Sequence, residues 1–216
     1  MRVRVGIAPR AQPFEESMDS LAVAMRAAED AGIEIMVEKV RGGGPGFQNF
    51  GPIVAHTIAA GDTHFFNAAD DVLYPPDTII RLVNADKDVI CGVYRKNSVA
   101  QLQPANHCLT SAEEFIRRLK EGGIYPTEFA SAHTMTIKRE VLEKMIADNP
   151  QLAYKEGNET CYALSMPMIH EGFVLLDDWA FSLRARQSGF TLWDDFGCQL
   201  KHYCAGFLGF EALLCG

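Results

Sequence analysis

Short extended segments alternate with helices through the first half of the chain, and this alternation limits the possible folds more than any other feature. A period of two over Arg2 to Ala8 indicates a strand, and apolar residues three or four apart indicate a helix over Glu15 to Ala31. Further strands are predicted at Ile33 to Val40, Thr63 to Asn67 and Asp88 to Tyr94, with helices near Ile53 to Ala60 and Asp77 to Asn84. Strands separated by helices are typical of βαβ units. We therefore expect one Rossmann-like α/β domain with a mixed, mostly parallel central sheet flanked by helices.

The second half of the chain carries weaker patterns. Helices are predicted at Ser111 to Lys120, Arg139 to Ala147 and Asp177 to Gln187, the first of them behind a Ser-x-x-Glu capping sequence. Extended segments are expected at Glu128 to Lys138, Phe190 to Trp193 and Cys198 to Tyr203. No regular period is present from Asn149 to Leu176, and long irregular segments in a compact domain usually serve a function. We expect this segment to be a lid over a site.

Composition narrows the class of protein. The 216 residues suffice for a single domain over 1–216. The 28 acidic side chains outnumber the 20 basic ones, giving a formal charge of -8 that argues against nucleic acid as a partner. No apolar run approaches the ~20 residues of a transmembrane segment, and no secretory signal is visible, so we expect a cytoplasmic protein. The apolar ending Leu213 to Gly216 fits the first domain of a longer polypeptide and a dimer face equally well.

The first candidate site is the acidic pair Asp70 and Asp71, which directly follows a predicted strand. In an open α/β sheet, ligands bind beyond the carboxyl ends of the strands. Two carboxylates there can hold Mg²⁺ or Mn²⁺, which keep positions open for phosphate oxygens. The alternative is a solvated turn, because aspartates before a Pro-Pro helix start are also good capping residues.

Two later features are ordinary when taken alone. Asp177 and Asp178 open a predicted helix, where negative charge is favourable without any further role. His202 lies in an apolar segment between Cys198 and Cys204, and a zinc site there would need more ligands than the segment offers. An isolated histidine in such a segment is usually a hydrogen-bonded core residue.

Taken in order, these features resemble the GT-A type of glycosyltransferase, the family-2-like nucleotide-diphospho-sugar transferases. The segments that carry the resemblance are Phe65 to Pro76, Asp88 to Tyr94, Asp177 to Arg186, Gly189 to Trp193, and then His202. The resemblance implies a GT-A-like fold and an enzyme that moves a sugar from a nucleotide-diphosphate donor, expected to be a UDP-sugar, to a hydroxyl of a glycan or other acceptor. It also implies an Mn²⁺ or Mg²⁺ cofactor and, from the later acidic pair, an inverting reaction.

The resemblance also implies roles for individual residues. Asp71 takes the last, metal-binding acid of the DxD motif, with His202 as the second metal ligand. Asp70 occupies the middle position, where it would bind metal or nucleotide. Asp178 matches the base that removes the acceptor proton, supported by Asp177. A general base of this kind accelerates a reaction by roughly 10²- to 10⁴-fold.

Three further residues are expected at the nucleotide, because Ala8, Pro9 and Arg10 follow the first strand at the same end of the sheet. Trp179 is a candidate for stacking on the acceptor or sugar, although a tryptophan at a helix start is more often part of a core. Ala69 departs from the DxD pattern, which leaves open a nucleotide-sugar-binding module without turnover. A nucleotidyltransferase is a third possibility, but the first loop lacks the glycine pattern that such enzymes need.

Overall fold

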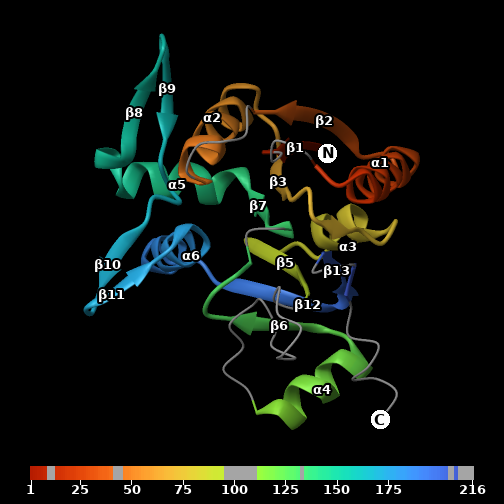
Figure 1. Ribbon diagram of the computed structural model, residues 1–216. Coiled ribbons are helices and arrows are strands. Elements are labelled where there is room, and N and C mark those ends of the chain that lie inside the picture. Colours follow the sequence, from red (N-terminus) through yellow and green to blue (C-terminus); the bar gives the residue numbers. More distant parts are fainter. Residues whose placement is uncertain (9–12, 41–45, 95–110, 132–133, 204–206, 209–216) are drawn as a thin grey trace.

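The computed structural model describes residues 1–8, 13–40, 46–94, 111–131, 134–203 and 207–208. Its centre is a seven-stranded sheet with the order β2-β1-β3-β7-β5-β12-β6 (Figure 1). The strands are β1 (Arg2–Ile7), β2 (Glu34–Lys39), β3 (His64–Ala68), β5 (Val89–Val93), β6 (Ile124–Thr127), β7 (Thr136–Lys138) and β12 (Leu192–Gln199). Five of them run in one direction, while β7 and β6 run against their neighbours. The predicted mixed, mostly parallel sheet is confirmed.

Helices cover both faces of this sheet. They are α1 (Glu15–Asp30), α2 (Gly46–Ala59), α3 (Thr78–Asn84), α4 (Ala112–Glu121), α5 (Arg139–Asp148) and α6 (Asp177–Gln187). Residues of α1 and α3 share one core with one face of the sheet, and residues of α2, α5 and α6 share a second core with the other face. α4 packs at the far edge, beside β12 and β6 (Figure 1).

The two cores meet at β3, where neighbouring side chains point to opposite faces. Phe65 belongs to the core beneath α2, α5 and α6, whereas Phe66 belongs to the core beneath α1 and α3. Both rings are fully buried. Burying a side chain of this size stabilises a fold by about 1.5–3 kcal/mol, so β3 contributes to both layers at once. The strand is thereby held firmly, and the acidic turn that follows it has a fixed starting point.

Smaller sheets lie outside the central sheet. A three-stranded sheet combines β4 (Val72–Leu73), β13 (Lys201–Tyr203) and β14 (Phe207–Leu208), and two hairpins are formed by β8 (Ala153–Glu156) with β9 (Glu159–Tyr162) and by β10 (Met168–His170) with β11 (Phe173–Leu175). A short 3₁₀ turn, η2 (Pro150–Leu152), precedes the first hairpin. In the part of the chain that is described, no helix combines the length and the apolar character of a membrane span.

The structure corrects the expected irregular segment from Asn149 to Leu176. Two hairpins occupy most of it, and their turns place Gly157, Glu171 and Gly172 at positive φ. Each strand has only three or four residues, which is too short for a period of two to be recognised in the sequence. A segment that was expected to be one loop is therefore two ordered projections.

Other boundaries differ by smaller amounts. α2 begins at Gly46 and continues through Pro52, where the sequence predicted a helix only from about Ile53. The extended segment expected over Glu128 to Lys138 is a strand only in β7, and β6 was not predicted. The α4 cap is as predicted, since the Ser111 hydroxyl accepts a hydrogen bond from the Glu114 amide at 3.2 Å.

Candidate functional site

The carboxyl ends of the parallel strands meet at one edge of the sheet, and the residues of interest lie at or just beyond these ends. Ala8 comes after β1, Asp70 and Asp71 come after β3, and Tyr94 comes after β5. β12 is parallel to β5, so the chain that leaves it delivers His202 to the same edge. Parallel sheets place ligand crevices at this edge. Residues far apart in the sequence are therefore brought together by strand direction alone.

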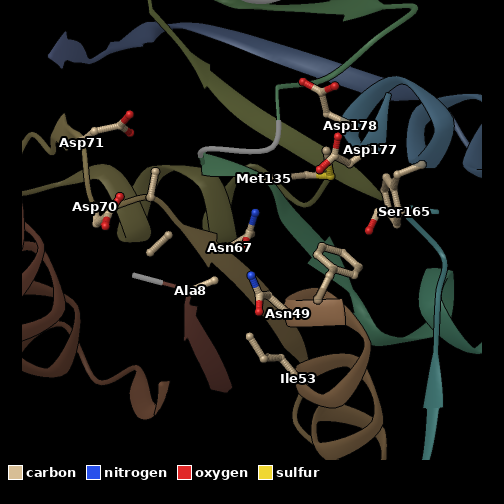
Figure 2. Close-up of a pocket in the computed structure, with 14 residues that line it drawn as sticks. Ala8, Asn49, Ile53, Asn67, Asp70, Asp71, Met135, Ser165, Asp177 and Asp178 are labelled. Atoms are coloured by element: carbon tan, nitrogen blue, oxygen red, sulfur yellow. The ribbon is translucent and has the colours of Figure 1, made fainter. Parts of the chain in front are cut away.

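A cavity of about 220 Å³ lies at this edge (Figure 2). The described residues that line it are Ala8, Asn49, Phe50, Ile53, Asn67, Ala68, Ala69, Asp70, Asp71, Met135, Ser165, Asp177, Asp178 and Phe181. Both predicted acidic pairs are among them, and Figure 2 shows the two pairs on either side of Asn67. The nucleotide candidates Pro9 and Arg10 lie outside the described residues.

The turn that carries the first acidic pair is fixed by its backbone. The Phe14 amide donates to the carbonyl oxygen of Asp70 at 3.2 Å, and the Tyr203 amide donates to that of Asp71 at 2.8 Å. The Tyr74 hydroxyl also donates to the Ala69 carbonyl at 2.8 Å and accepts from the Ala69 amide at 2.7 Å. Both aspartates are buried and project in different directions from the turn. A simple capping turn would leave these side chains in solvent, whereas here both are buried.

Asp71 and His202 form a buried pair. The His202 Nε2 atom lies 3.3 Å from the Asp71 Oδ2 atom, and both residues are nearly inaccessible to solvent. The pairing of β13 with β4 places His202 opposite Val72, the residue after Asp71. The contact between residues 71 and 202 is thus a product of strand register.

These residues suit part of a metal site. Within the described ranges, no group of three or more histidine, cysteine, aspartate or glutamate side chains is arranged to hold a metal ion. Mg²⁺ and Mn²⁺ often take only one or two protein ligands and complete their shell with water and substrate phosphates. One carboxylate with one imidazole is compatible with that role and favours Mn²⁺ over Mg²⁺, which prefers oxygen ligands throughout. Asp70 lines the same cavity.

The second acidic pair opens α6 as predicted. Asp177 and Asp178 occupy its first turn, and the Asp178 Oδ1 atom accepts a hydrogen bond from the Trp179 amide at 2.9 Å. Negative charge is stabilised at this end of a helix. Trp179 is not among the described residues that line the cavity; its ring stacks on Phe129, with centroids 4.7 Å apart. Its expected contact with sugar stays untested.

Sequence reasoning missed Tyr94, which contacts His202 beside the candidate site. Its ring lies edge-on to His202 at 5.1 Å, and its hydroxyl contacts the Ser131 hydroxyl. Burial raises the pKa of Tyr94 well above its usual value; the bond to Ser131 offsets part of this, and the charges of Asp178 and Asp71 raise the pKa further. Tyr94 could have been selected from the sequence, because it lies at the carboxyl end of a predicted central strand, where site residues are expected.

Three other polar residues of the cavity were also missed. Asn49 comes from α2, Asn67 from β3, and Ser165 from the segment between the two hairpins. Figure 2 shows both asparagine side chains among the lining residues between Ala8 and Asp177. Amide groups donate and accept hydrogen bonds, so they can select polar groups of a ligand. No period or motif distinguishes Asn49 and Ser165 in the sequence, whereas Asn67 lies in the segment Phe65 to Pro76 that carries the resemblance but was given no role.

Comparisons with known proteins define the fold and little else. No protein-family model matches the chain, and no curated protein matches it either. Among solved structures, the crystal structure of A197 from STIV matches with a TM-score of 0.52 and 14% identity, over 94% of this chain and 86% of that one. The inositol-1-phosphate CTP transferase from T. maritima matches with a TM-score of 0.38 and 11% identity, over 90% and 88% of the two chains. The first of these supports a shared α/β fold.

Proposed function

We propose that this protein is a metal-dependent glycosyltransferase that uses a nucleotide-diphosphate sugar, expected to be a UDP-sugar. The observation that carries the proposal is the convergence of Asp71, Asp178 and His202, which come from three distant parts of the sequence. Asp71 and Asp178 line one cavity, and His202 contacts Asp71. The resemblance of the ordered sequence motifs to GT-A enzymes supplies the reaction class.

The electrostatics of the cavity favour a cation. Four carboxylates line it, those of Asp70, Asp71, Asp177 and Asp178, and no lysine or arginine is among its described lining residues. Like charges at close range destabilise one another, and an anionic diphosphate would add to that repulsion. A divalent cation held by Asp71 and His202 would relieve the repulsion and, when bound, stabilise the charge that develops on a departing diphosphate.

The second acidic pair is placed to act on the acceptor. An acceptor hydroxyl is a poor nucleophile at neutral pH, so a fixed carboxylate that accepts its proton helps the reaction. Asp178 is held by the Trp179 amide and lines the cavity from the side opposite Asp70. We assign it the role of base, with Asp177 orienting the acceptor. Asn67 and Asn49 would then bind polar groups of the donor between the two pairs.

The donor half of the proposal is tested by thermal stability in the presence of UDP, with and without Mn²⁺. At ~100 times its dissociation constant, a ligand adds about 2.7 kcal/mol to the free energy of unfolding. We expect stabilisation by UDP only when Mn²⁺ is present, and its loss in Asp71→Asn. The exposed Asp19 on α1 provides the matched control, because Asp19→Asn should retain the full effect. Equal stabilisation without metal, or in Asp71→Asn, would contradict the assignment.

The transfer half is tested with Asp178→Asn and a panel of UDP-sugars and hydroxyl acceptors. We expect this variant to keep the Mn²⁺-dependent UDP effect and to lose transfer by about 10²-fold or more, since only the proton acceptor is removed. A wild-type protein that binds donors and never transfers would instead be a binding module. Release of pyrophosphate from a nucleoside triphosphate would identify a nucleotidyltransferase.

A further inference from the structure

The hairpin of β10 and β11 projects from the body next to α6 (Figure 1). Ile169 pairs with Val174 and Met168 with Leu175, and the two-residue turn of Glu171 and Gly172 has positive φ at both positions, 50° and 82°. Two successive positive φ values are characteristic of tight hairpin turns whose twist matches that of the strands. The hairpin is therefore a regular structure with a defined inner and outer face.

The inner face of the hairpin is anchored to the body. Leu175 packs with Ala180 and Leu183 of α6, and Met168 packs against the same cluster. The buried Arg184 guanidinium donates to the Met166 carbonyl at 2.6 Å and to the Leu164 carbonyl at 2.8 Å. The chain that enters the hairpin is therefore also fixed. The outer face is thus presented in a fixed orientation.

The outer face carries an apolar surface that nothing in the described chain covers. Ile169 and Val174 lie directly opposite each other on it, and Leu176 follows on the same side in extended backbone. Their exposed fractions are 75%, 67% and 61%, and Phe173 beside the turn is 72% exposed. These are the four most exposed large apolar residues that the structure describes. An antiparallel sheet usually has a polar outer face, so a contiguous apolar one indicates an interaction surface.

We propose that this outer face docks on a lipid surface of neutral or zwitterionic composition. A stable protein interface needs about 20–30 residues on each side and about ten hydrogen bonds. The outer face offers a few aliphatic side chains with no polar group among them. The apolar contribution to lipid binding grows with the apolar area that is buried and needs no hydrogen-bonding group on the protein. The formal charge of -8 disfavours binding to an anionic membrane, because like charges repel. We therefore expect zwitterionic headgroups.

The flanks of the hairpin agree with this occupant. Trp179 and Phe129 stack at its base, and the Arg186 guanidinium lies 5.9 Å from the Phe129 ring centroid. Aromatic rings and cations are the groups that proteins place at the headgroup level. Glu171 at the turn is exposed, so the hairpin would lie along the lipid surface, with this carboxylate among the headgroups, rather than point into it.

Docking would bring the candidate site to the lipid surface. Leu176 is followed directly by Asp177 and Asp178, which line the cavity. If the proposed transferase function holds, on which this corollary rests, the acceptor hydroxyl belongs to a membrane-resident molecule. The docking surface itself does not depend on that function.

The experiment is flotation of the full chain with phosphatidylcholine vesicles. We expect wild-type protein to float with the vesicles and the double variant Ile169→Ser/Val174→Ser to bind at least tenfold more weakly, since each substitution removes an apolar side chain from the contact. The matched control is Val23→Ser/Val37→Ser, two half-exposed valines on α1 and β2, which should bind as wild type does. Unchanged circular dichroism and melting temperature show that each variant is folded, and the single variant Ile169→Ser replaces the double variant if that fails to fold.

Several results would overturn the lipid assignment. They are wild-type protein that stays with the aqueous fraction, control valines that matter as much as the hairpin, and binding that appears only with anionic lipid. A dimer that dissociates in the hairpin variant, in the absence of vesicle binding, would assign the surface to a second copy of the chain. The Mn²⁺-dependent UDP effect, measured without vesicles, reports on the proposed function separately.

Discussion

At the scale of single residues, Gly92 is packed closely against Cys198 and Leu200, in the segment that leads to His202. A Cβ atom at this position would lie 2.5 Å from Leu200 Cδ1 and 2.8 Å from the Cys198 carbonyl oxygen. The first neighbour is a side chain, but the second is backbone and cannot rotate away. The strand β5 can therefore approach the end of β12 closely only because residue 92 has no side chain.

We predict that Gly92→Ala destabilises the protein by about 1–3 kcal/mol through overpacking, although alanine is otherwise favoured over glycine in regular structure. Urea unfolding followed by circular dichroism measures the change. Val23→Ala on the exposed side of α1 serves as the comparison and should change stability by less than about 0.5 kcal/mol. A Gly92→Ala protein as stable as wild type would show that β12 can move.

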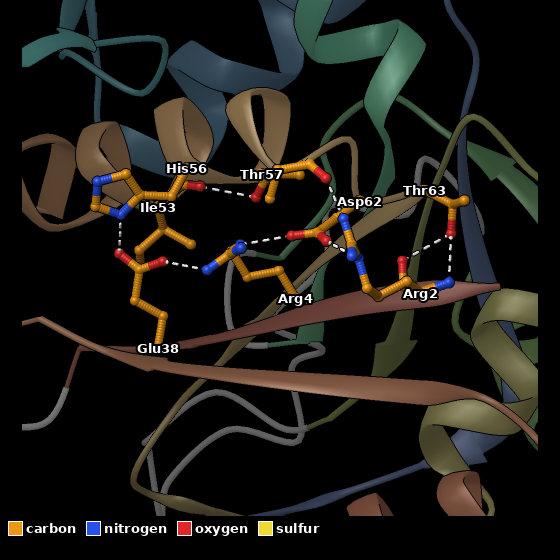
Figure 3. A network of polar contacts seen from close by, with 9 residues as sticks. Arg2, Arg4, Glu38, Ile53, His56, Thr57, Asp62 and Thr63 are labelled. Atoms are coloured by element: carbon orange, nitrogen blue, oxygen red, sulfur yellow. Dashed lines mark hydrogen bonds and ion pairs between the residues drawn. The ribbon is translucent and has the colours of Figure 1, made fainter.

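At the scale of elements, an ionic network ties the β8–β9 hairpin to the central sheet. Figure 3 shows the part of this network that surrounds His56, Glu38, Arg4 and Asp62. His56 on α2 lies 2.6 Å from Glu38 of β2 through Nδ1 and 3.0 Å from Glu159 of β9 through Nε2. Arg4 of β1 then joins Glu38, at 2.9 Å, to the buried Asp62, at 2.7 Å. Both His56 nitrogens face carboxylates, and only a doubly protonated ring can donate to both.

This network predicts a pH-dependent stability. Burial alone would lower the pKa of His56, but its hydrogen bonds to Glu38 and Glu159 outweigh burial and raise the pKa above 6.5. Because the folded pKa is the higher one, the stabilisation is complete below about pH 6.5 and is lost as pH rises through the folded pKa. His56 is more than one-third exposed, so the loss should stay below about 1 kcal/mol.

Denaturant unfolding at several pH values between 5.5 and 8.5 (roughly the range in which histidine titrates) measures this loss. His56→Gln should remove the loss of stability above about pH 6.5. It should leave the opposite contribution of His64, whose pKa burial lowers to about 4 and which therefore stabilises the fold as pH rises towards 6.5. His170→Gln provides the control, because His170 is equally exposed but has a carboxylate on only one side, 3.9 Å away. A decline in stability above about pH 6.5 that persists in His56→Gln would assign the decline to another group.

At the scale of the whole molecule, the sheet separates two cores that share few side chains. Phe65 packs against Phe50 with ring centroids 4.9 Å apart, whereas Phe66 lies 6.2 Å from Tyr74 on the other face. The two phenylalanines are neighbours in sequence but have different partners. Additivity usually holds for residues that share no partners and lie more than ~7–10 Å apart. Phe65 and Phe66 meet only the first condition, and we expect their opposite orientations to be sufficient for independence.

A double-mutant cycle tests this independence. We predict that Phe65→Leu and Phe66→Leu each cost about 1–2 kcal/mol and that the double variant costs their sum to within about 0.5 kcal/mol. Urea unfolding of the four proteins gives the interaction free energy. An interaction above 1 kcal/mol (about twice the ~0.5 kcal/mol scatter expected of independent sites) would mean that the two layers adapt to each other through the backbone of β3.

The sequence by itself determined the central architecture, because its signals are local. Apolar residues at a helical spacing identified α1, and the bounds of α6 were predicted from its acidic start and following glycine. The buried run of β5 indicated a strand covered on both faces, and it lies inside the sheet. The rule that ligands bind beyond strand ends also selected Asp70 and Asp71, which do line the cavity.

Only the tertiary structure decided what those residues meet. The contact between Asp71 and His202 depends on the register of β13 against β4, and the role of Tyr94 depends on Ser131 and the neighbouring acids. The two hairpins were not predicted, because strands of three or four residues are stabilised by packing against α2 or α6 rather than by their own pattern. Local periodicity reports which residues can form an element, whereas long-range packing free energy determines which elements touch.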